Sequence, residues 1–261
     1  MGPCIGTPIF KPQVNPKINS AKKTKSLNLD KMDYSDLDFM EKVEIENLVL
    51  LSAENNRLYK LPITFFKKQK KIKKLLLSNN NFVEFPFNIN DNQSLDKIVL
   101  SHNLIRIIPP SISNIANLKD LNLSYNKLSE IPQEFTLLIN LEILDLSFNH
   151  FSQFHPFFLN IPKLQYLTIR NNEISSLPKS EWAFSSLTTL DISFNNLTEI
   201  PVDLFKHSQI SALNLKSNKI HRSDLYNIDG FLEFEERRKH RKDQGFTMNL
   251  DINFNLCGLE S

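Results

Sequence analysis

The sequence predicts an α/β solenoid, in which stacked coils share one core and a curved parallel sheet lines the concave side. The first observation is a series of asparagines separated by 24 residues once and by 23 residues thereafter, namely Asn56, Asn80, Asn103, Asn126, Asn149, Asn172, Asn195 and Asn218. The second is a frame of apolar residues that surrounds these asparagines at constant offsets. A fixed step of this length is typical of stacked repeats, because every coil must place the same residue at the same point.

The frame is clearest between residues 118 and 132. Leu121 and Leu123 alternate with period two, so both side chains point to one side of a short strand. Leu128 and Ile131 return to the core, and Pro132 ends the strand-like stretch because it has no N–H to donate. The buried side chains of one coil rest on those of the next, so no single repeat forms a core alone.

The recurring asparagine is predicted to be structural. After each strand the chain must turn sharply, which leaves backbone N–H and C=O groups facing inward without strand partners. An asparagine amide carries both donors and acceptors, so a column of amides can satisfy those groups in one coil after another.

The frame can be followed through eight full repeats, beginning with Leu48 and ending near Ile220. Ahead of them, Leu27, Leu29 and Tyr34 indicate a degenerate repeat that lacks the asparagine. We therefore expect one solenoid domain at 20–245, preceded by a disordered basic, proline-containing arm at 1–19 and followed by a tail at 246–261.

The C-terminal end is expected to be capped by a helix over 223–245. Ser223 is a suitable helix N-cap, and Asp224 lies in the first turn, where the helix dipole favours an acid. An apolar stripe at helical spacing follows, acids precede bases along the segment, and Gly245 is a suitable stop. Such a cap shields the apolar surface of the last coil from water.

Composition excludes several function classes. The formal net charge of +2 argues against general nucleic-acid binding, which needs a concentrated basic footprint. The six histidines show no metal-ligand spacing, and five glycines leave scarcely enough for a phosphate-binding loop. We therefore predict no catalytic residues, no metal and no cofactor. With only Cys4 and Cys257, disulfide-bonded end caps cannot form, which favours a cytoplasmic protein.

Two basic segments leave alternatives open. The N-terminal arm begins Met-Gly, so Gly2 and Cys4 are candidate lipidation sites beside several lysines, and a membrane surface is a candidate partner. A plain disordered arm is the competing interpretation. The run between Lys67 and Lys74 could dock on an acidic lipid or partner, or serve as a nuclear address, and a solvated face is the simpler interpretation.

Outward positions of the strands and the position before each asparagine define a candidate partner-binding surface over the fourth to seventh repeats. It combines aromatic residues and an arginine with polar groups, a composition typical of binding hot spots. Its residues are Tyr125, Ile143, Asp145, Phe148, Tyr166, Arg170, Asp191 and Phe194. For Tyr125, Phe148 and Phe194, packing over the rim onto neighbouring coils is an equal alternative.

The repeat Leu-x-x-Leu-x-Leu-x-x-Asn-x-Leu-x-x-Leu-Pro resembles the intracellular, Ras-signalling-associated class of leucine-rich-repeat proteins. The resemblance covers residues 48–222 and implies a horseshoe with a parallel concave sheet. More narrowly, the Met-Gly start, the degenerate first repeat and the segment 225–231 resemble a small membrane-associated adaptor of that class.

These observations lead to one functional expectation with two alternatives. We expect a non-catalytic intracellular scaffold or adaptor, monomeric, that binds a protein partner of unknown identity on its concave face. The alternatives are a regulatory subunit of a signalling enzyme, such as a phosphatase or a small GTPase, and an N-terminally acylated peripheral membrane adaptor.

Overall fold

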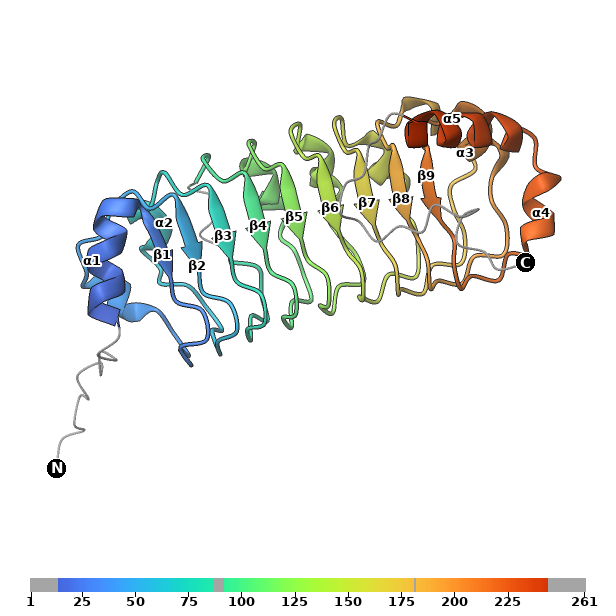
Figure 1. Cartoon of the computed structure of the whole chain (residues 1–261). Coiled ribbons are helices and arrows are strands. Elements are labelled where there is room, and N and C mark those ends of the chain that lie inside the picture. Colours follow the sequence, from blue (N-terminus) through green and yellow to red (C-terminus); the bar gives the residue numbers. More distant parts are fainter. Residues whose placement is uncertain (1–13, 87–91, 181, 244–261) are drawn as a thin grey trace.

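A computed structural model describes residues 14–86, 92–180 and 182–243 of the chain. The predicted solenoid is confirmed. Nine parallel strands form one sheet in sequence order, as Figure 1 shows. They are β1 Ser26–Asn28, β2 Leu50–Ser52, β3 Lys74–Leu76, β4 Lys97–Val99, β5 Asp120–Asn122, β6 Ile143–Asp145, β7 Tyr166–Thr168, β8 Thr189–Asp191 and β9 Ala212–Asn214.

The strand register follows directly from the repeat frame. Leu121 in the middle of β5 pairs with Leu144 in the middle of β6, and both side chains are buried. The flanking positions pair in the same way, so Asp120 lies beside Ile143. Each strand thus sends its central leucine or isoleucine into the core and its two outer residues to the concave face.

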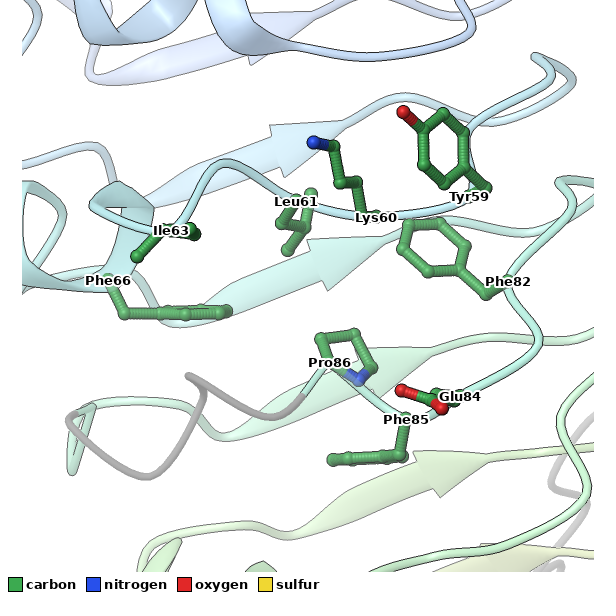
Figure 2. Close-up of a pocket in the computed structure, with 9 residues that line it drawn as sticks. All are labelled: Tyr59, Lys60, Leu61, Ile63, Phe66, Phe82, Glu84, Phe85 and Pro86. Atoms are coloured by element: carbon green, nitrogen blue, oxygen red, sulfur yellow. The ribbon is translucent and has the colours of Figure 1, made fainter.

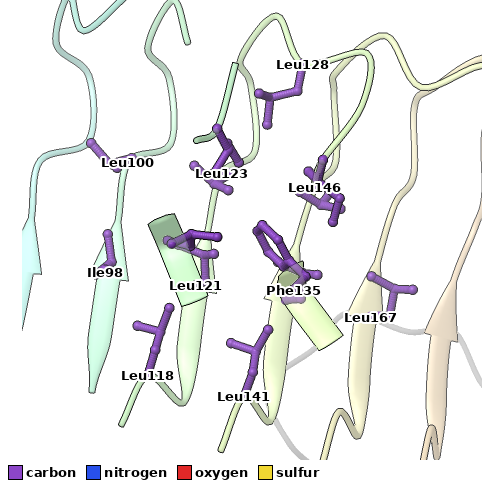
Figure 3. Close-up of a cluster of buried hydrophobic side chains, with 14 of the residues drawn as sticks. Ile98, Leu100, Leu118, Leu121, Leu123, Leu128, Phe135, Leu141, Leu146 and Leu167 are labelled. Atoms are coloured by element: carbon purple, nitrogen blue, oxygen red, sulfur yellow. The ribbon is translucent and has the colours of Figure 1, made fainter. Parts of the chain in front are cut away.

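The core is a continuous stack of these apolar side chains. Leu121 and Leu123 lie between the equivalent residues of the preceding and following coils, as Figure 3 shows. Phe135 closes the same coil from the convex side and is fully buried. Because every coil contributes to the layer of its neighbours, the core runs unbroken from one end of the solenoid to the other.

The convex side is built from short helical segments. Most follow the proline that ends the frame, and Trp182 donates its indole N–H to the carbonyl of Pro178 at 2.8 Å. A 23-residue coil leaves little room after the strand and its turn, so these segments stay short. They are η1 Asp38–Glu41, α2 Phe65–Lys68, η3 Pro110–Asn114, η4 Gln133–Leu137, η5 Pro156–Asn160, η6 Trp182–Phe184 and α3 Val202–His207.

The N-terminal boundary differs from the expectation of a disordered arm over 1–19. Helix α1, Val14–Thr24, begins inside that range and packs against β1 (Figure 1). Ile18 and Ala21, three residues apart on one helix face, are buried in the core. This apolar pair closes the first coil, while the lysines of α1 remain on its outer side, and the described solenoid therefore begins at Val14.

The C-terminal cap also differs from the expected single helix over 223–245. It consists of two helices, α4 Arg222–Tyr226 and α5 Phe231–Asp243. The N-cap of α4 is His221 instead of Ser223, and the His221 N–H donates to Asp224 Oδ2 at 3.1 Å. Gly230 separates the helices at a φ of +86°, a left-handed conformation that favours glycine.

Several predicted features lie outside the described residues. They are the candidate lipidation sites Gly2 and Cys4, the helix stop at Gly245 and the tail at 246–261. These remain predictions from the sequence.

Candidate binding surface

The asparagine column forms the hydrogen bonds that a turn ladder requires. Asn126 donates through Nδ2 to the carbonyls of Leu100 and Leu123, at 2.9 and 3.0 Å. Its Oδ1 accepts from the backbone N–H of Ile105, one coil earlier, at 3.0 Å. The same pattern recurs from Asn80 to Asn218, so each amide ties its own turn to the preceding coil. This ladder fixes the positions of the residues around it.

The residue before each ladder asparagine has a left-handed backbone. All eight have φ between 52° and 56°, and they are Asn55, Asn79, His102, Tyr125, Phe148, Asn171, Phe194 and Ser217. Asparagine tolerates this conformation well, whereas bulky side chains are strained there by about 1–2 kcal/mol. The aromatic residues at this position therefore need a compensating interaction.

Stacking between coils supplies that interaction for three of them. The rings of His102 and Tyr125 are parallel to within 13°, with centroids 3.9 Å apart. Tyr125 and Phe148 repeat this arrangement at 3.9 Å and 11°. The guanidinium of Arg170, from the following coil, lies 5.2 Å from the centre of the Phe148 ring. We call these four side chains, His102, Tyr125, Phe148 and Arg170, the aromatic stack.

The aromatic stack is open to solvent along its edge. Tyr125 is 38% exposed, and His102 and Arg170 are exposed as well. Phe194 occupies the same frame position two coils beyond Phe148 and is 42% exposed. For Tyr125 and Phe148, both alternatives therefore hold in part, because the ring faces pack on neighbouring coils while part of each side chain remains accessible.

The strand residues of the candidate surface lie beside the stack on the concave face. Ile143 of β6 pairs with Tyr166 of β7, and Asp145 pairs with Thr168. All four are half-buried. The sheet therefore presents an apolar–aromatic pair and a polar pair side by side, next to the turn that carries Phe148.

The two aspartates of the predicted surface are engaged by their own turns. Asp145 Oδ1 accepts hydrogen bonds from the Ser147 N–H at 2.9 Å and the Ser147 hydroxyl at 2.6 Å. Asp191 makes the equivalent bonds with Ser193, at 3.0 and 2.6 Å. Only 6% of Asp191 is exposed. The sequence predicts Asp191 as part of the accessible surface, whereas its burial and these bonds give its carboxylate a structural role in the turn.

Burial also affects the electrostatics of Asp145. Desolvation raises the pKa of its carboxyl group, and the hydrogen bonds from Ser147 and the charge of Arg170 oppose that rise. Arg170 of the aromatic stack and Asp145 of strand β6 are thus near enough for their charges to attract each other. The structure therefore brings six of the eight predicted residues together as two adjacent groups, one on strands β6 and β7 and one in the neighbouring turns. Phe194 lies beyond the second group and lines a shallow hollow together with Phe148.

Sequence reasoning missed His102 as a member of the surface. It occupies the same frame position as Tyr125 and Phe148, so the signal was present in the repeat alignment. What the sequence does not show is that this position is left-handed and stacks from coil to coil.

A hollow of about 200 Å³ lies between the first two full repeats. Figure 2 shows its lining, in which Phe66, Phe82 and Phe85 are core residues. Lys60 and Glu84 add one charge of each sign. The hollow is thus an apolar seam between two coils, and we assign no ligand to it.

The lysine run from Lys67 to Lys74 lies at the turn between the first two full repeats. Its lysines are exposed, whereas Gln69 and Ile72 are buried within the solenoid. Across the described residues, there is no group of three histidine, cysteine or acidic side chains that could hold a metal ion. No helix in the same part of the chain is long and apolar enough to cross a membrane.

Comparison with known proteins agrees with this architecture. Two family models described as leucine-rich repeats match the chain, one at residues 93–151 and 139–193 and the other at residues 186–208. Residues 93–208 of the chain therefore consist of leucine-rich repeats. The predicted horseshoe with a parallel sheet is the fold that the solved structures below share with this chain. No curated protein sequence matches the chain.

Solved structures of leucine-rich-repeat proteins from bacteria and plants are similar to it. A leucine-rich-repeat protein of Leptospira interrogans is 29% identical, with a TM-score of 0.66 over 72% of this chain and 47% of that protein. Internalin C2 of Listeria monocytogenes, 24% identical with a TM-score of 0.59 over 70% of this chain and 78% of its own, shows the fold alone.

The Arabidopsis receptor kinase HAESA, solved with the peptide hormone IDA and the co-receptor SERK1, is 26% identical with a TM-score of 0.58. That match covers 68% of this chain and 31% of the receptor chain. This chain thus spans less than half the length of the Leptospira protein and of the receptor.

Proposed function

We propose that this leucine-rich-repeat protein is a non-catalytic adaptor that binds a protein partner through the aromatic stack and the adjacent concave strands β6 and β7. The observation that carries the proposal is the aromatic stack itself. Tyr125 and Phe148 occupy a strained backbone position that asparagine fills in other repeats, and Tyr125 exposes its ring edge to solvent. Strained residues of this kind concentrate at functional sites.

The composition and layout of the surface support protein binding. Two aromatic rings and an arginine are held rigidly against one another, so little side-chain entropy is lost when a partner covers them. Ile143 and Tyr166 extend the same surface onto the sheet. Among similar structures, HAESA is a complex with a peptide hormone, and a related plant receptor, RGFR1, is a complex with RGF2, which is consistent with a peptide or protein ligand here.

The test replaces the two central aromatics with the residue that neighbouring repeats carry. A Tyr125→Asn/Phe148→Asn variant removes the stack but keeps a side chain that tolerates the left-handed backbone. The relief of backbone strain, about 1–2 kcal/mol per residue, roughly offsets the lost stacking of about 0.5–1.5 kcal/mol per pair. We therefore expect a nearly unchanged thermal midpoint, together with loss of partners captured by wild-type protein and identified by mass spectrometry.

The control is Tyr59→Ser, at a residue outside the aromatic stack and the strands. Tyr59 is more exposed than Tyr125 and lies at a frame position where later repeats carry serine. It should retain every partner. Partners that survive the double asparagine variant, or that are lost equally in the Tyr59 variant, would place binding elsewhere on the molecule.

Finer assignments extend this proposal. We place the adaptor in the Ras-signalling-associated class and in the cytoplasm on the strength of the repeat consensus and the scarcity of cysteine. Regulation of a phosphatase or small GTPase, or acylation at Gly2 or Cys4, would add a signalling or membrane role to the same binding surface. Mass spectrometry of the N-terminal peptide from cells tests acylation directly, and an unmodified Gly2 and Cys4 would reject the membrane alternative.

A further inference from the structure

Helix α5 and the edge of the sheet form a cleft. This cleft lies beside the proposed partner-binding surface and has no role in the function proposed above. The helix lies along the edge at which the last strands begin, as Figure 1 shows. Its arginines reach the residues just before strands β8 and β9. The cleft between them has a volume of about 350 Å³ and is lined by Gln165, Tyr166, Thr188, Gln209, Ser211, Arg237, His240 and Arg241.

Two arginines dominate the chemistry of this cleft. Arg237 donates from Nε to the Ile210 carbonyl at 3.2 Å and from Nη2 to the Phe205 carbonyl. Arg241 donates from Nη1 to the Thr188 carbonyl, the Thr189 hydroxyl and the Ser211 hydroxyl, at 3.1, 2.8 and 3.2 Å. These bonds hold both guanidinium groups in place, so their positions are preorganised.

Neither arginine of the cleft is paired directly with a described carboxylate. Every acceptor in the bonds above is a carbonyl or a hydroxyl. Arg238, one residue away, pairs with Glu235 at 2.7 Å instead. Burial lowers the pKa of Arg237, and the charge of Glu233, which forms no direct ion pair with Arg237, only partly opposes that effect.

Unused donors remain on both side chains. No described residue accepts from Nη1 of Arg237 or from Nε and Nη2 of Arg241. A guanidinium offers these N–H groups in a planar fork that matches the oxygens of a phosphate. Amide side chains that line the cleft, such as Gln165 and Gln209, can donate further hydrogen bonds to the same oxygens.

We propose that this cleft binds a phosphate monoester on a side chain of the protein partner. The proposal deepens the adaptor function and rests on it, because Tyr166 lines the cleft and also belongs to the concave surface. A partner seated on strands β6 and β7 would thus reach the cleft without leaving the sheet. A phosphorylated side chain matches two fixed guanidinium groups better than a single-charge carboxylate does.

Isothermal titration of the purified full chain with a short peptide tests the proposal. The probe is an acetylated, amidated Gly-Gly-phosphoserine-Gly-Gly peptide, compared with the same peptide carrying serine or glutamate and with inorganic phosphate. We expect saturable binding of one phosphopeptide per chain, at least about tenfold tighter than the glutamate peptide, and none of the serine peptide. Equal affinity for inorganic phosphate and phosphopeptide would overturn the assignment to a partner side chain.

Variants locate the site. Arg241→Gln and Arg237→Gln should each weaken phosphopeptide binding about tenfold or more, whereas Lys239→Gln on the exposed side of the same helix should leave it unchanged. An equal loss in the Lys239 variant would show nonspecific charge attraction and reject the site. Should an arginine variant unfold, amide NMR shifts of wild-type Thr188, Ser211 and Gln165 on peptide addition decide the matter, and unshifted signals would reject it.

The same titration separates this proposal from the adaptor function. The Tyr125→Asn/Phe148→Asn variant changes the aromatic stack and leaves the cleft intact, so its phosphopeptide affinity should match wild type. If that variant loses its protein partners but keeps the phosphopeptide, both proposals stand. If wild-type protein binds protein partners through the stack but no phosphopeptide, only the cleft assignment fails.

Discussion

At the scale of single residues, one frame position carries two kinds of side chain with opposite physical consequences. Asparagine at positions such as Asn79 and Asn171 accepts the left-handed turn easily, whereas Tyr125 and Phe148 accept it at a cost in backbone strain. Parallel stacking at 3.9 Å offsets part of that strain and holds the rings in a fixed column. Rigidity and exposure at the same point are what a binding surface requires.

The ladder asparagines provide the first residue-scale prediction. Asn149 donates to the carbonyls of Leu123 and Leu146 at 3.0 Å and accepts from the Leu128 N–H at 2.9 Å, all in the buried turn. Asn149→Ala leaves these groups unpaired and should lower the free energy of unfolding by about 1–3 kcal/mol in urea denaturation. Asn140→Ala, which removes two exposed bonds, one to the Ala116 carbonyl and one from Lys163, is the control and should cost clearly less.

The desolvated carboxylate of Asp145 provides the second residue-scale prediction. Burial raises the pKa of this carboxyl group in the folded state, so its ionisation destabilises the fold at neutral pH. This loss of stability disappears as pH falls through the folded-state pKa towards the ordinary aspartate value. Asn122 holds the equivalent position and accepts the same two bonds from Ser124. Asp145→Asn should therefore keep the turn and be at least as stable as wild type at about pH 7.

The pH dependence distinguishes this explanation from a simple packing effect. The stability difference between Asp145→Asn and wild type should shrink between about pH 7 and about pH 4, as measured by urea unfolding at each pH. A variant that is less stable than wild type at neutral pH would show that the charge itself, through Arg170, holds the turn together.

At the scale of elements, the two ends of the solenoid are closed by different devices. Helix α1 lays Ile18 and Ala21 on the first coil, whereas α5 packs Phe231 and Phe234 against Phe205 of α3. The break between α4 and α5 lets the chain turn back over the last coil. One straight helix over the same residues could not pack against the solenoid along its whole length.

Gly230 makes that turn possible and carries the element-scale prediction. A Cβ at this position would lie 2.7 Å from the backbone nitrogen of Lys206 and 2.8 Å from its Cα, in addition to the strain at a φ of +86°. Gly230→Ala should therefore destabilise the cap by about 1–3 kcal/mol and speed hydrogen exchange in α5.

Asp229→Ala, at the preceding residue, is the control variant for this measurement. Asp229 forms an exposed ion pair with Lys206 at 2.8 Å, and such pairs contribute little to stability. The Asp229 variant should therefore keep the exchange rate of α5. Equal acceleration in both variants would mean that the ion pair, and not the close backbone approach, positions the helix.

At the scale of the whole molecule, the sequence predicts the structural features that recur in every repeat. It does not predict the features that occur only once. The asparagine spacing and the Leu121–Leu123 alternation predict the sheet, its register and the outward placement of Ile143 and Tyr166. The helix α1 and the break at Gly230 occur once each, so no periodicity reveals them. The stacking of Tyr125 on its neighbours depends on the left-handed turn, a property of backbone geometry that composition does not display.

Repeat architecture also determines how the molecule should unfold. Each coil contacts only its neighbours, so the stability of a coil depends on the adjacent interfaces and not on distant ones. Phe234 is fully buried at the C-terminal end, 5.2 Å from the ring of Phe205. Removing it should weaken the last coils first and leave the centre of the sheet unaffected.

Phe234→Ala should lower stability by about 3–5 kcal/mol at the cap, as expected for a buried phenylalanine. Hydrogen exchange followed by mass spectrometry should then show faster exchange in β9 and β8, with β2 to β6 retaining wild-type protection, because local unfolding begins at the weakened end. Phe135→Ala, at an equally buried site in the middle of the solenoid, should instead accelerate exchange on both sides of β5 and β6. Uniform acceleration along the sheet in the Phe234 variant would show that the solenoid unfolds as one cooperative unit. The terminal cap would then contribute as much to the stability of the region around the aromatic stack as the coils that carry the stack.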